Sequence, residues 1–525
     1  MMENHRELLE PWFDADYYLS VNRDVRDEGI DPLEHYCAYG WRERRNPSRS
    51  FDVEYYLANN PDVISADVDP LLHYVLRGRE EGRDPVPTAW AERQELHRYR
   101  QQVLFDSPRL KSIEVDLSAG ELEAAISEKS SVGIILSLSH DDYATAVGGI
   151  QNLIGDEREE YNQRGWQYLY LSPAAAPLQT LEQSENPLLS IRLNGRHLGI
   201  IAAEALVPVI ARAGTRQPIQ TIVHHMMGQS PAVVGRLCQL SMESSGNKPV
   251  FWVHDFFTVC SQYNLLRNGI SFCGAPDPYS AACEVCCHGL ERKSHSAAIN
   301  ELFEATRPIV LAPSKVALEH WTRYSALPHS EAQVRPLAKL VFADQAVRED
   351  ATTSAALRIA HLGGRVFHKG WHVFERLANR FRNDHRYDFV CLGGGEEFHQ
   401  DGILNYPVIV SPERRHAMVE AVALHNIDAV VNVSIWPETF SYTAYEALAG
   451  GAFLIAGKSA GNVWPVVQEN APGQGCALDS EADLIELFES GTVVGLVRGA
   501  KRRRGALIAD TGTAGWMLSN GLLAS

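Results

Sequence analysis

From Ser131 onward, short apolar runs alternate with stretches of helical periodicity, and this pattern constrains the fold more than any other feature. The first apolar run covers 132–136, and similar runs follow at 167–171, 220–223, 250–253 and 309–311. Helical stretches such as 149–164 and 314–324 lie between them. Strands that alternate with helices form a parallel sheet with helices on both faces. The sequence therefore predicts an α/β domain over residues 131–340.

The same alternation restarts beyond a polar stretch near residues 339–354. Its apolar runs cover 357–362, 389–392, 429–433 and 453–456. This restart predicts a second α/β domain over residues 341–490, followed by a tail at 491–525. Ligands of paired α/β domains bind at the carboxyl ends of the strands and between the domains. We therefore expect two Rossmann-like domains with a ligand cleft between them.

An internal duplication occupies residues 1–87. Its second copy follows the first at a constant offset of 38 residues, with Phe13-Asp14 recurring as Phe51-Asp52. Asp31-Pro32 recurs as Asp69-Pro70, in the form of an N-cap followed by a first helical residue. Gly40 and Gly78 come where these helices should end. We predict two stacked helix pairs with one core, joined to the first α/β domain by a linker helix at 88–130.

Each repeat carries a histidine among tyrosines and leucines, at His35 and His73. Because they lie at helical spacing in an apolar face, we expect these two histidines to be hydrogen-bonded core residues. A role in binding a ligand is the alternative.

The net charge of −18 argues against broad nucleic-acid binding, which needs a basic surface. One basic cluster near the end of the chain contains Arg498, Lys501, Arg502, Arg503 and Arg504. It predicts either a solvated helix end or a contact with an anionic membrane. The first residues have no apolar signal region, and no apolar run is long enough to span a bilayer. We expect a cytoplasmic protein, with peripheral binding to the inner face of the membrane as an open alternative.

The strongest chemical motif lies in the second α/β domain. Glu438 and Glu446 are separated by seven residues in a segment that follows one predicted strand and opens a helix. If Ser441 caps that helix, Glu446 lies inside it while Glu438 stays on the preceding loop. The amides near Phe440 and Ser441 then point, with the helix dipole, to a space that suits a phosphate.

Two further pieces of this domain follow strands. Arg365 and Lys369 lie between the strand at 357–362 and a helix, where they can neutralise a diphosphate. The glycine run 393–395 follows the next strand and is a weaker signal.

In this order, these motifs resemble those of the family 4 retaining glycosyltransferases, over about residues 132–490. The repeats resemble those fused to bacterial surface-polysaccharide glycosyltransferases. The resemblance implies a GT-B fold and transfer of a hexose from a nucleotide-diphosphate sugar to a polysaccharide or lipid-linked glycan, with retention and without a metal in the chemical step. The repeats would recruit protein partners.

The resemblance also implies roles for single residues. Glu438 would contact the donor sugar and Glu446 the ribose, while Lys369 and Arg365 would neutralise the diphosphate. The family commonly has Gly where this chain has Ser441.

In the first α/β domain, Gly148 and Gly149 resemble the family's glycine-rich loop beside the donor. His254, with Asp255, resembles its His-Asp element near the reacting sugar. His224 and His225 also end a strand, and for all three histidines a structural hydrogen bond to loop backbone is the alternative to a role in the site.

Four cysteines crowd the segment after His254, at Cys260, Cys273, Cys283 and Cys286. The Cys-x2-Cys pair and two further thiols predict one structural zinc ion per chain. Reduced free thiols and redox or iron–sulfur chemistry are the alternatives.

Two other functions stay open at this point. A GT-B sugar-nucleotide epimerase would need neither an acceptor nor the repeats, and a binding protein could keep a degenerate GT-B scaffold. Glu438, Glu446 and Lys369 together favour the transferase.

Overall fold

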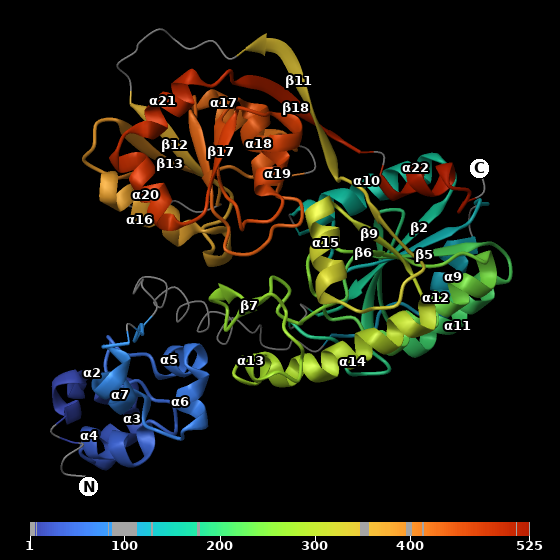
Figure 1. The fold of residues 1–525 in the computed structure, drawn as a ribbon. Helices are drawn as coiled ribbons and strands as arrows, with labels where there is room; N and C mark the ends of the chain where they lie inside the picture. Colours follow the sequence, from blue (N-terminus) through green and yellow to red (C-terminus); the bar gives the residue numbers. More distant parts are fainter. Residues whose placement is uncertain are drawn as a thin grey trace. The chain divides into compact units, whose positions relative to one another are not determined.

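A computed structural model describes residues 6, 8–81, 83–86, 113–127, 130–146, 148–175, 179–346, 356–394, 402–411, 414–510 and 512–523. The chain divides into two compact units, Met1–Ser107 and Pro108–Ser525 (Figure 1). Most of the predicted linker helix at 88–130 lies outside the described residues, although its end contains helix α9 (Ala119–Ser127).

The first unit consists of the two repeats, which fold alike. The first contains η1 (Glu10–Trp12), α2 (Ala15–Val21), α3 (Arg23–Glu28), α4 (Pro32–His35) and the π-helical turn η2 (Tyr36–Gly40). The second contains α5 (Val53–Asn59), α6 (Pro61–Ser65), α7 (Pro70–His73) and η3 (Tyr74–Gly78). Each repeat therefore has two short helices where one first helix was predicted. In the first repeat the break is at Asn22, whose side-chain amide donates to the Tyr18 carbonyl at 2.9 Å.

The predicted caps and the shared core are present. Asp31 accepts from the amide of Glu34 at 2.8 Å, and Asp69 accepts from that of Leu71 at 2.9 Å. One apolar cluster runs through both repeats and includes Tyr18 and Tyr56. His35 and His73 are core histidines, as expected: each Nδ1 is bonded to one of these tyrosine hydroxyls, at 2.9 and 2.8 Å.

Gly78 is required by close packing. A Cβ atom at this position would lie 2.1 Å from the Tyr56 hydroxyl oxygen, which is itself held by His73. Gly40 stands in the same relation to Tyr18 in the first repeat, at 2.2 Å.

We expect Gly78→Ala to destabilise the repeat unit by about 1–3 kcal/mol, because the added methyl group overpacks a rigid contact. Calorimetric unfolding of the full chain measures this loss. In Gly78→Ala/Tyr56→Phe the clashing oxygen is gone, so the two losses should be less than additive. Fully additive losses would mean that the clash is relieved elsewhere.

The second unit begins with a mixed sheet of eight strands in its described part, in the order β10-β9-β6-β5-β1-β2-β3-β4. Its strands are β1 (Ile134–Leu138), β2 (Gln167–Pro173), β3 (Leu188–Leu193), β4 (Arg196–Ala202), β5 (Ile219–Val223), β6 (Val250–Trp252), β9 (Ile309–Ala312) and β10 (Glu331–Val334). All neighbouring pairs are parallel except β2–β3 and β3–β4.

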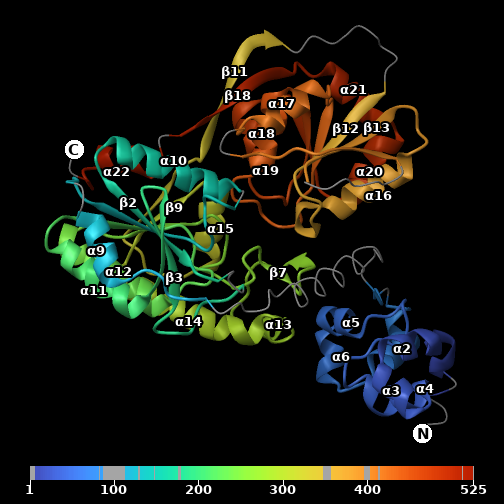
Figure 2. The same cartoon turned by 180° about the vertical axis from the view of Figure 1, so that it is seen from behind.

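Helices cover both faces of this sheet (Figures 1 and 2). Leu136 of β1 packs into the cluster of one face, and Ile135 packs into that of the other. The first face carries α9, α11 (Ala203–Gly214), α12 (Pro231–Ser245) and α14 (Gly289–Thr306), and the second carries α10 (Gly149–Gln163). The helix α15 (Lys315–Tyr324) follows β9, while β7 (Leu266–Arg267), β8 (Ser271–Phe272) and α13 (Ala281–Glu284) lie in the loop-rich segment after β6.

The second sheet is parallel throughout its described part, with six strands in the order β14-β13-β12-β15-β16-β17. They are β12 (Leu357–Leu362), β13 (Tyr387–Leu392), β14 (Ile403–Tyr406), β15 (Ala429–Asn432), β16 (Phe453–Gly457) and β17 (Gly475–Leu478). Counted from β12, this is the 3-2-1-4-5-6 order of a Rossmann fold. Successive strands are added on one side of β12 up to β14 and on its other side from β15 onward, so the strand order reverses between β12 and β15. The chain thus contains a helical repeat module followed in sequence by two Rossmann-like domains, which confirms the predicted GT-B architecture.

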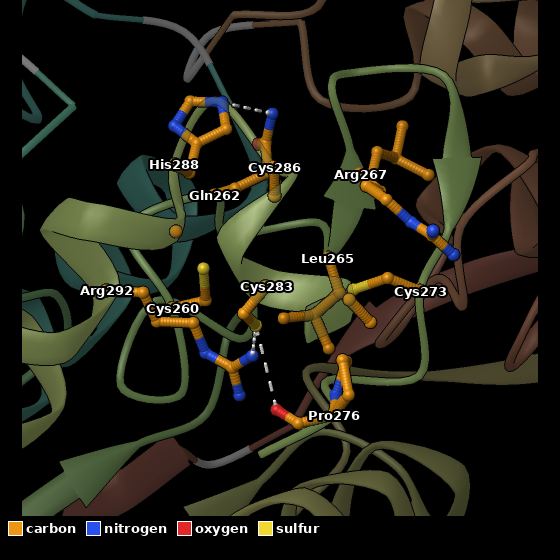
Figure 3. Close-up of a pocket in the computed structure, with 13 residues that line it drawn as sticks. Cys260, Gln262, Leu265, Arg267, Cys273, Pro276, Cys283, Cys286, His288 and Arg292 are labelled. Carbon is orange, nitrogen blue, oxygen red and sulfur yellow. Dashed lines mark hydrogen bonds between the residues drawn. The ribbon is translucent and has the colours of Figure 1, made fainter. Parts of the chain in front are cut away.

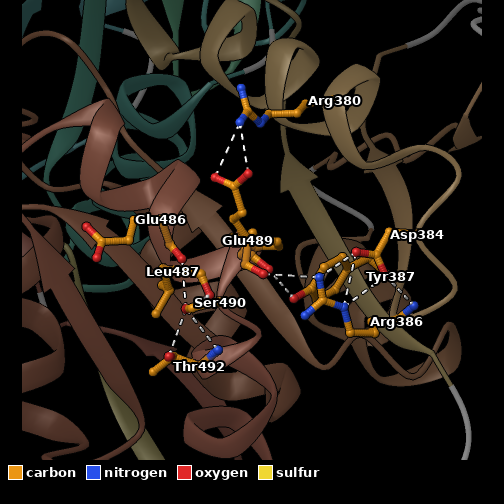
Figure 4. Close-up of polar contacts among 10 residues, drawn as sticks. Arg380, Asp384, Arg386, Tyr387, Glu486, Leu487, Glu489, Ser490 and Thr492 are labelled. Carbon is orange, nitrogen blue, oxygen red and sulfur yellow. Dashed lines mark hydrogen bonds and ion pairs between the residues drawn. The ribbon is translucent and has the colours of Figure 1, made fainter.

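Helices also cover both faces of the second sheet. Side chains of α16 (Trp371–Phe381), α20 (Glu481–Glu489) and α21 (Thr492–Gly499) form one cluster, and those of α17 (Ala417–Leu424), α18 (Tyr442–Gly450) and α19 (Val463–Asn470) join the other. Figure 4 shows how the α20–α21 junction is held: Tyr387 donates to the Phe488 carbonyl at 2.7 Å, and Arg380 pairs with Glu489 at 3.2 Å.

Beyond α21 the chain returns to the first α/β domain. The strand β18 (Arg503–Ala509) pairs antiparallel with β11 (Ala338–Ala346), the strand that connects the two domains. The last helix, α22 (Gly512–Ser519), packs on α10, where the Tyr161 hydroxyl lies 3.3 Å from the Met517 sulfur.

The basic cluster near the end of the chain is partly used inside the fold. Arg502 is buried and pairs with Asp428 at 3.1 Å, and the Arg503 guanidinium lies 4.3 Å from the centre of the Phe342 ring. Membrane contact by this cluster stays a prediction. Among the described helices, none has both the length and the apolar character needed to cross a bilayer.

Candidate functional site

A polar cavity opens at the point where the strand order of the second sheet reverses. Its empty volume is about 220 Å³, and its lining residues are His361, Leu362, Lys369, Val430, Val431, Asn432, Ser434 and Thr443. These residues come from the ends of β12 and β15 and from the segments that follow them. In open α/β sheets ligands bind at this point, outside the carboxyl ends of the strands.

Glu438 lies beside this cavity on the loop between β15 and α18. Glu438 is only 4% exposed. Its Oε1 accepts hydrogen bonds from Ser434 Oγ at 2.8 Å and from Trp436 Nε1 at 3.0 Å. The loop backbone is also fixed, because the Asn462 amide donates to the Glu438 carbonyl at 2.8 Å. A buried carboxylate held by this many donors is pre-oriented for contact with a ligand.

Lys369 completes an ion pair with Glu438. Its Nζ lies 2.6 Å from Oε1 and 2.8 Å from Oε2 of the carboxylate. Lys369 ends the short 3-10 helix η4 (Phe367–Lys369), and Gly370 follows with φ of 78°. A Cβ atom at Gly370 would lie 2.4 Å from the Val433 carbonyl oxygen, so this glycine lets the loop approach the end of β15 closely. The Lys369 side chain keeps 35% of its surface exposed, which leaves it accessible to a ligand.

Ser441 and Phe440 form the turn into α18. Ser441 has φ of 62° and ψ of 70°, the left-handed conformation that glycine adopts most easily. This geometry explains why glycine suits the position, and Asn432 Nδ2 supports Ser441 by donating to its Oγ at 3.2 Å. No described side chain caps α18, so its first amides remain available to an anion. The Phe440 ring packs inward on Tyr445, with 4.5 Å between ring centres.

Glu446 lies in the second turn of α18 and is only 6% exposed. Burial raises the pKa of its carboxyl from the ordinary value of 4.5 to about 7. No described residue forms a hydrogen bond or ion pair with it, so this carboxyl has its full accepting capacity left for a ligand.

The raised pKa of Glu446 predicts how stability changes with pH. Between about pH 4.5 and 7 the native carboxyl holds its proton while the unfolded one loses it, so the free energy of unfolding falls as pH rises across this window. Glu446→Gln removes the charge and this loss. We therefore expect the difference in free energy of unfolding between Glu446→Gln and the wild type to grow in favour of the variant from pH 5 to pH 8, by up to about 3 kcal/mol.

Thermal unfolding of both proteins at the two pH values measures the gain. Glu420→Gln, which changes an exposed carboxylate of the same domain, is the control. A gain for Glu446→Gln that is equal at both pH values would contradict the assignment.

Arg365 lies apart from the Lys369–Glu438 pair as the structure stands. Its guanidinium is directed to the end of β13, where burial raises the pKa of the Cys391 thiol and Arg365 acts in the opposite direction. It is also close to Gly394, since a Cβ atom there would lie 3.4 Å from its Nη1. The structure therefore brings Lys369 and Glu438 together and leaves Arg365 at the neighbouring strand end.

The glycine-rich loop of the first α/β domain reaches the start of α18. Gly148 precedes α10 and Gly149 begins it. A Cβ atom at Gly149 would lie 2.6 Å from the Tyr442 ring, so the absence of a side chain allows this contact between the domains. This places the N-termini of α10 and α18 near each other.

His254, His224 and His225 gather at the carboxyl ends of β5 and β6. His225 uses both ring nitrogens: Nε2 lies 2.7 Å from Asp255 Oδ2, and Nδ1 accepts from the Met227 amide at 3.0 Å. His225 is thus fully satisfied within the fold. His254 stacks on Trp252, and its carbonyl accepts from Thr439 Oγ1 at 2.5 Å, which ties it to the loop that carries Glu438.

Several residues of this site escaped the sequence analysis. Asn432, Ser434 and Thr443 line the cavity, and Trp436 holds Glu438. The first two are polar residues at the end of a buried apolar strand, which is a readable signal. His361 also lines the cavity, and burial lowers its pKa to about 4, so its ring is neutral at pH 7.

The predicted zinc site is wrong. Cys260, Cys273, Cys283 and Cys286 do line one pocket, but no group of three or more His, Cys, Asp or Glu side chains in the described chain is arranged to hold a metal ion. Figure 3 shows the reason: the buried Arg292 guanidinium points at Cys283, and its Nη1 lies 2.8 Å from the sulfur. A permanent positive charge at that distance takes the place that a cation would need. None of the four forms a disulfide.

The solved structures described below are similar to this chain only at low sequence identity. No family profile and no curated protein matches the chain. Sucrose-phosphate synthase from Thermosynechococcus elongatus is similar over 74% of this chain and 98% of its own, with 13% identity and a TM-score of 0.42. HepE from Anabaena, in complex with UDP, is similar over 74% and 99%, with 11% identity and a TM-score of 0.39.

The pneumococcal O-GlcNAc transferase GtfA, in complex with UDP and GlcNAc, is similar over 70% of this chain and 94% of its own, with 8% identity and a TM-score of 0.41. Likenesses this distant say nothing about the activity of this chain, which has to be argued from its own residues.

Proposed function

We propose that this chain is a glycosyltransferase that takes a sugar from a nucleotide-diphosphate donor. The observation that carries the proposal is the Lys369–Glu438 pair, set at the edge of a polar cavity where the strand order of a Rossmann-type sheet reverses. The groups at this place match the two parts of a sugar diphosphate. The cation and the amides of α18 suit the anionic phosphates, and the buried carboxylate suits the hydroxyl groups of the sugar.

Lys369 and the start of α18 are the parts that we assign to the diphosphate. When the bond between the sugar and the phosphate breaks, negative charge collects on the leaving diphosphate, and a fixed cation and helix amides stabilise that charge. Arg365 is assigned to the same group and would have to turn from the end of β13 to reach it. Gly148 and Gly149, at the start of α10, leave room for a phosphate beside α18.

Glu438 is assigned to the sugar. In the free protein Lys369 neutralises it, and a diphosphate that draws Lys369 away leaves Glu438 bonded to Ser434 and Trp436. The carboxylate would then face the sugar, accept its hydroxyl groups and stabilise positive charge near the reacting carbon. Glu446, with no partner in the described fold, is assigned to the ribose hydroxyls.

The acceptor side is assigned to the first α/β domain, with His254 nearest the reacting sugar. The acceptor oxygen bonds to the sugar carbon on the face from which the diphosphate leaves, so that configuration is retained. The bond between the sugar and the phosphate breaks in the same step, and the hydroxyl proton passes to an oxygen of the departing diphosphate. The proposed acceptor is a polysaccharide or a lipid-linked glycan, and the repeats of residues 1–87 would recruit it or other proteins. Lys369, Arg365 and the amides supply the neutralising charge, so the proposed chemical step uses no metal.

A panel of sugar nucleotides tests the function directly. The purified full chain should hydrolyse one donor slowly without an acceptor and faster with the right glycan, releasing the nucleoside diphosphate. Glu438→Gln is the matched variant and should release about 100- to 1000-fold less. An isomeric sugar nucleotide as product would indicate an epimerase, and binding without any product would indicate a binding protein; either result would overturn the proposal.

A further inference from the structure

A line of buried polar side chains runs through the first α/β domain to His254. Thr513 of α22 donates to Glu157 Oε1 on α10. Glu157 Oε2 lies 3.0 Å from His224 Nε2, and His224 Nδ1 lies 3.2 Å from His254 Nε2. Glu157 and His224 are each 1% exposed and His254 is 7% exposed. These residues come from separate elements, and the line ends at the residue assigned to the reacting sugar.

The line fixes where the protons of the two imidazoles lie. A bare nitrogen of His224 facing a carboxylate oxygen at 3.0 Å would be repelled, so His224 Nε2 carries its proton toward Glu157. His224 Nε2 has no aligned hydrogen-bond partner among the described residues, so the negative oxygen 3.0 Å away is what orients this proton. With its Nε2 proton toward Glu157, His224 presents Nδ1 as the acceptor for Nε2–H of His254.

His254 is therefore left with a bare Nδ1. This atom is buried and has no hydrogen-bond partner among the described residues. Burial and the neighbouring His224 hold the pKa of His254 well below its usual range, so the ring is neutral and Nδ1 is an acceptor. His225 offers a contrast, because Asp255 and the Met227 amide use both of its nitrogens. A buried acceptor without a donor is costly to keep unless a ligand supplies the donor.

We propose that Glu157 is a positioning residue that acts through His224 to hold His254 in its Nε2–H tautomer, so that Nδ1 accepts a hydrogen bond from a hydroxyl of the bound sugar or acceptor. Thr513 anchors Glu157, which gives the last helix of the chain a part in the site. This inference rests on the proposed function for the identity of the ligand, but the tautomer itself belongs to the free protein.

Glu157→Leu and Glu157→Gln test the role of the carboxylate. Leu fills the space and removes the acceptor, so His224 no longer has a reason to carry its proton on Nε2. Gln keeps an acceptor oxygen of the same shape. We expect Glu157→Leu to lower kcat roughly 10- to 100-fold with nucleotide Kd nearly unchanged, and Glu157→Gln to recover most of the loss.

The control is His295→Gln. His295 is also buried in this domain, but its Nε2 is bonded to the Phe257 carbonyl at 2.6 Å and it is not part of the line. Its replacement should reduce the melting temperature without the fall in kcat. A similar fall in both variants, or no rescue by Gln, would mean that Glu157 serves packing alone and would overturn the proposal.

Nitrogen NMR of ¹⁵N-histidine in the full chain reads the tautomer without any turnover. With signals assigned through His254→Gln, His254 should show a pyridine-type Nδ1 and a pyrrole-type Nε2, and Glu157→Leu should mix or invert them. The opposite tautomer in the wild type, or no change in the variant, would refute the inference. If no sugar nucleotide is turned over, the proposed function fails while this reading of His254 can still succeed.

Discussion

Replacing Glu438 by Gln should lower the rate of sugar transfer by about 100- to 1000-fold while the protein stays folded. The amide has the shape of the carboxylate and can still accept from Ser434 and Trp436, which now hold Oε1 at 2.8 and 3.0 Å. It lacks the negative charge that we assign to the reacting sugar. Because charge matters most in the transition state, kcat should fall far more than the affinity for the donor.

Steady-state kinetics on the best donor of the panel, with calorimetric binding of the same donor, would measure the effect. The matched control is Glu481→Gln, because Glu481 is also paired with a cation of this domain, Arg376, at 2.5 Å. That variant should keep wild-type turnover. A rate for Glu438→Gln within about threefold of the wild type would remove Glu438 from the reaction.

Local pattern was sufficient to predict the residues that we assign to the donor. Lys369 and Glu438 each follow the end of a buried strand in a short loop, Glu446 lies in the helix after β15, and the topology brings the ends of β12 and β15 side by side. A strand that ends in a short polar loop places its first side chains at one edge of the sheet, whatever the rest of the chain does. The alternation of strands and helices predicted the parallel parts of both sheets for the same reason, but not the antiparallel strands β3 and β4 of the first sheet.

The line from Glu157 to His254 could not be predicted in this way. Glu157 lies in the middle of α10, where its neighbours in sequence read as an exposed polar face, yet it is 1% exposed because α22 covers it. That contact joins residues far apart in the chain, and local periodicity carries no information about it. Beyond residue 490 the sequence offered only the basic cluster as a motif, and nothing in it pointed to Thr513, which anchors Glu157.

The cysteine cluster shows the limit of spacing as evidence. Four thiols at suitable intervals predict a zinc site, but the intervals do not say which side chain fills the space between them. Arg292, on α14, fills it and bonds to Cys283 at 2.8 Å. A guanidinium that is always charged changes the chemistry of the pocket, and only the fold reveals that it is there.

Replacing Lys369 by Ala should weaken binding of the nucleoside diphosphate by about 10- to 100-fold and leave that of the nucleoside within about twofold. A charge-assisted hydrogen bond to phosphate contributes about 1.5–3 kcal/mol, and the nucleoside lacks the group that receives it. Titration calorimetry with both ligands measures the difference. Lys458→Ala is the control, because Lys458 belongs to the same domain and pairs with Asp479 at 2.6 Å away from the cavity. Equal losses for both ligands would place Lys369 away from the diphosphate.

The ion pair with Glu438 adds a second route to the same loss. Without Lys369 the carboxylate keeps its full charge beside the cavity and repels the diphosphate, even if Lys369 never touches the ligand. Lys369→Ala/Glu438→Gln separates the two routes. If repulsion alone weakens binding, the double variant should bind the diphosphate as well as Glu438→Gln does. If Lys369 bonds to the phosphates, as we propose, the double variant should bind about 10-fold or more weakly than Glu438→Gln, because neutralising the carboxylate cannot restore the missing donor.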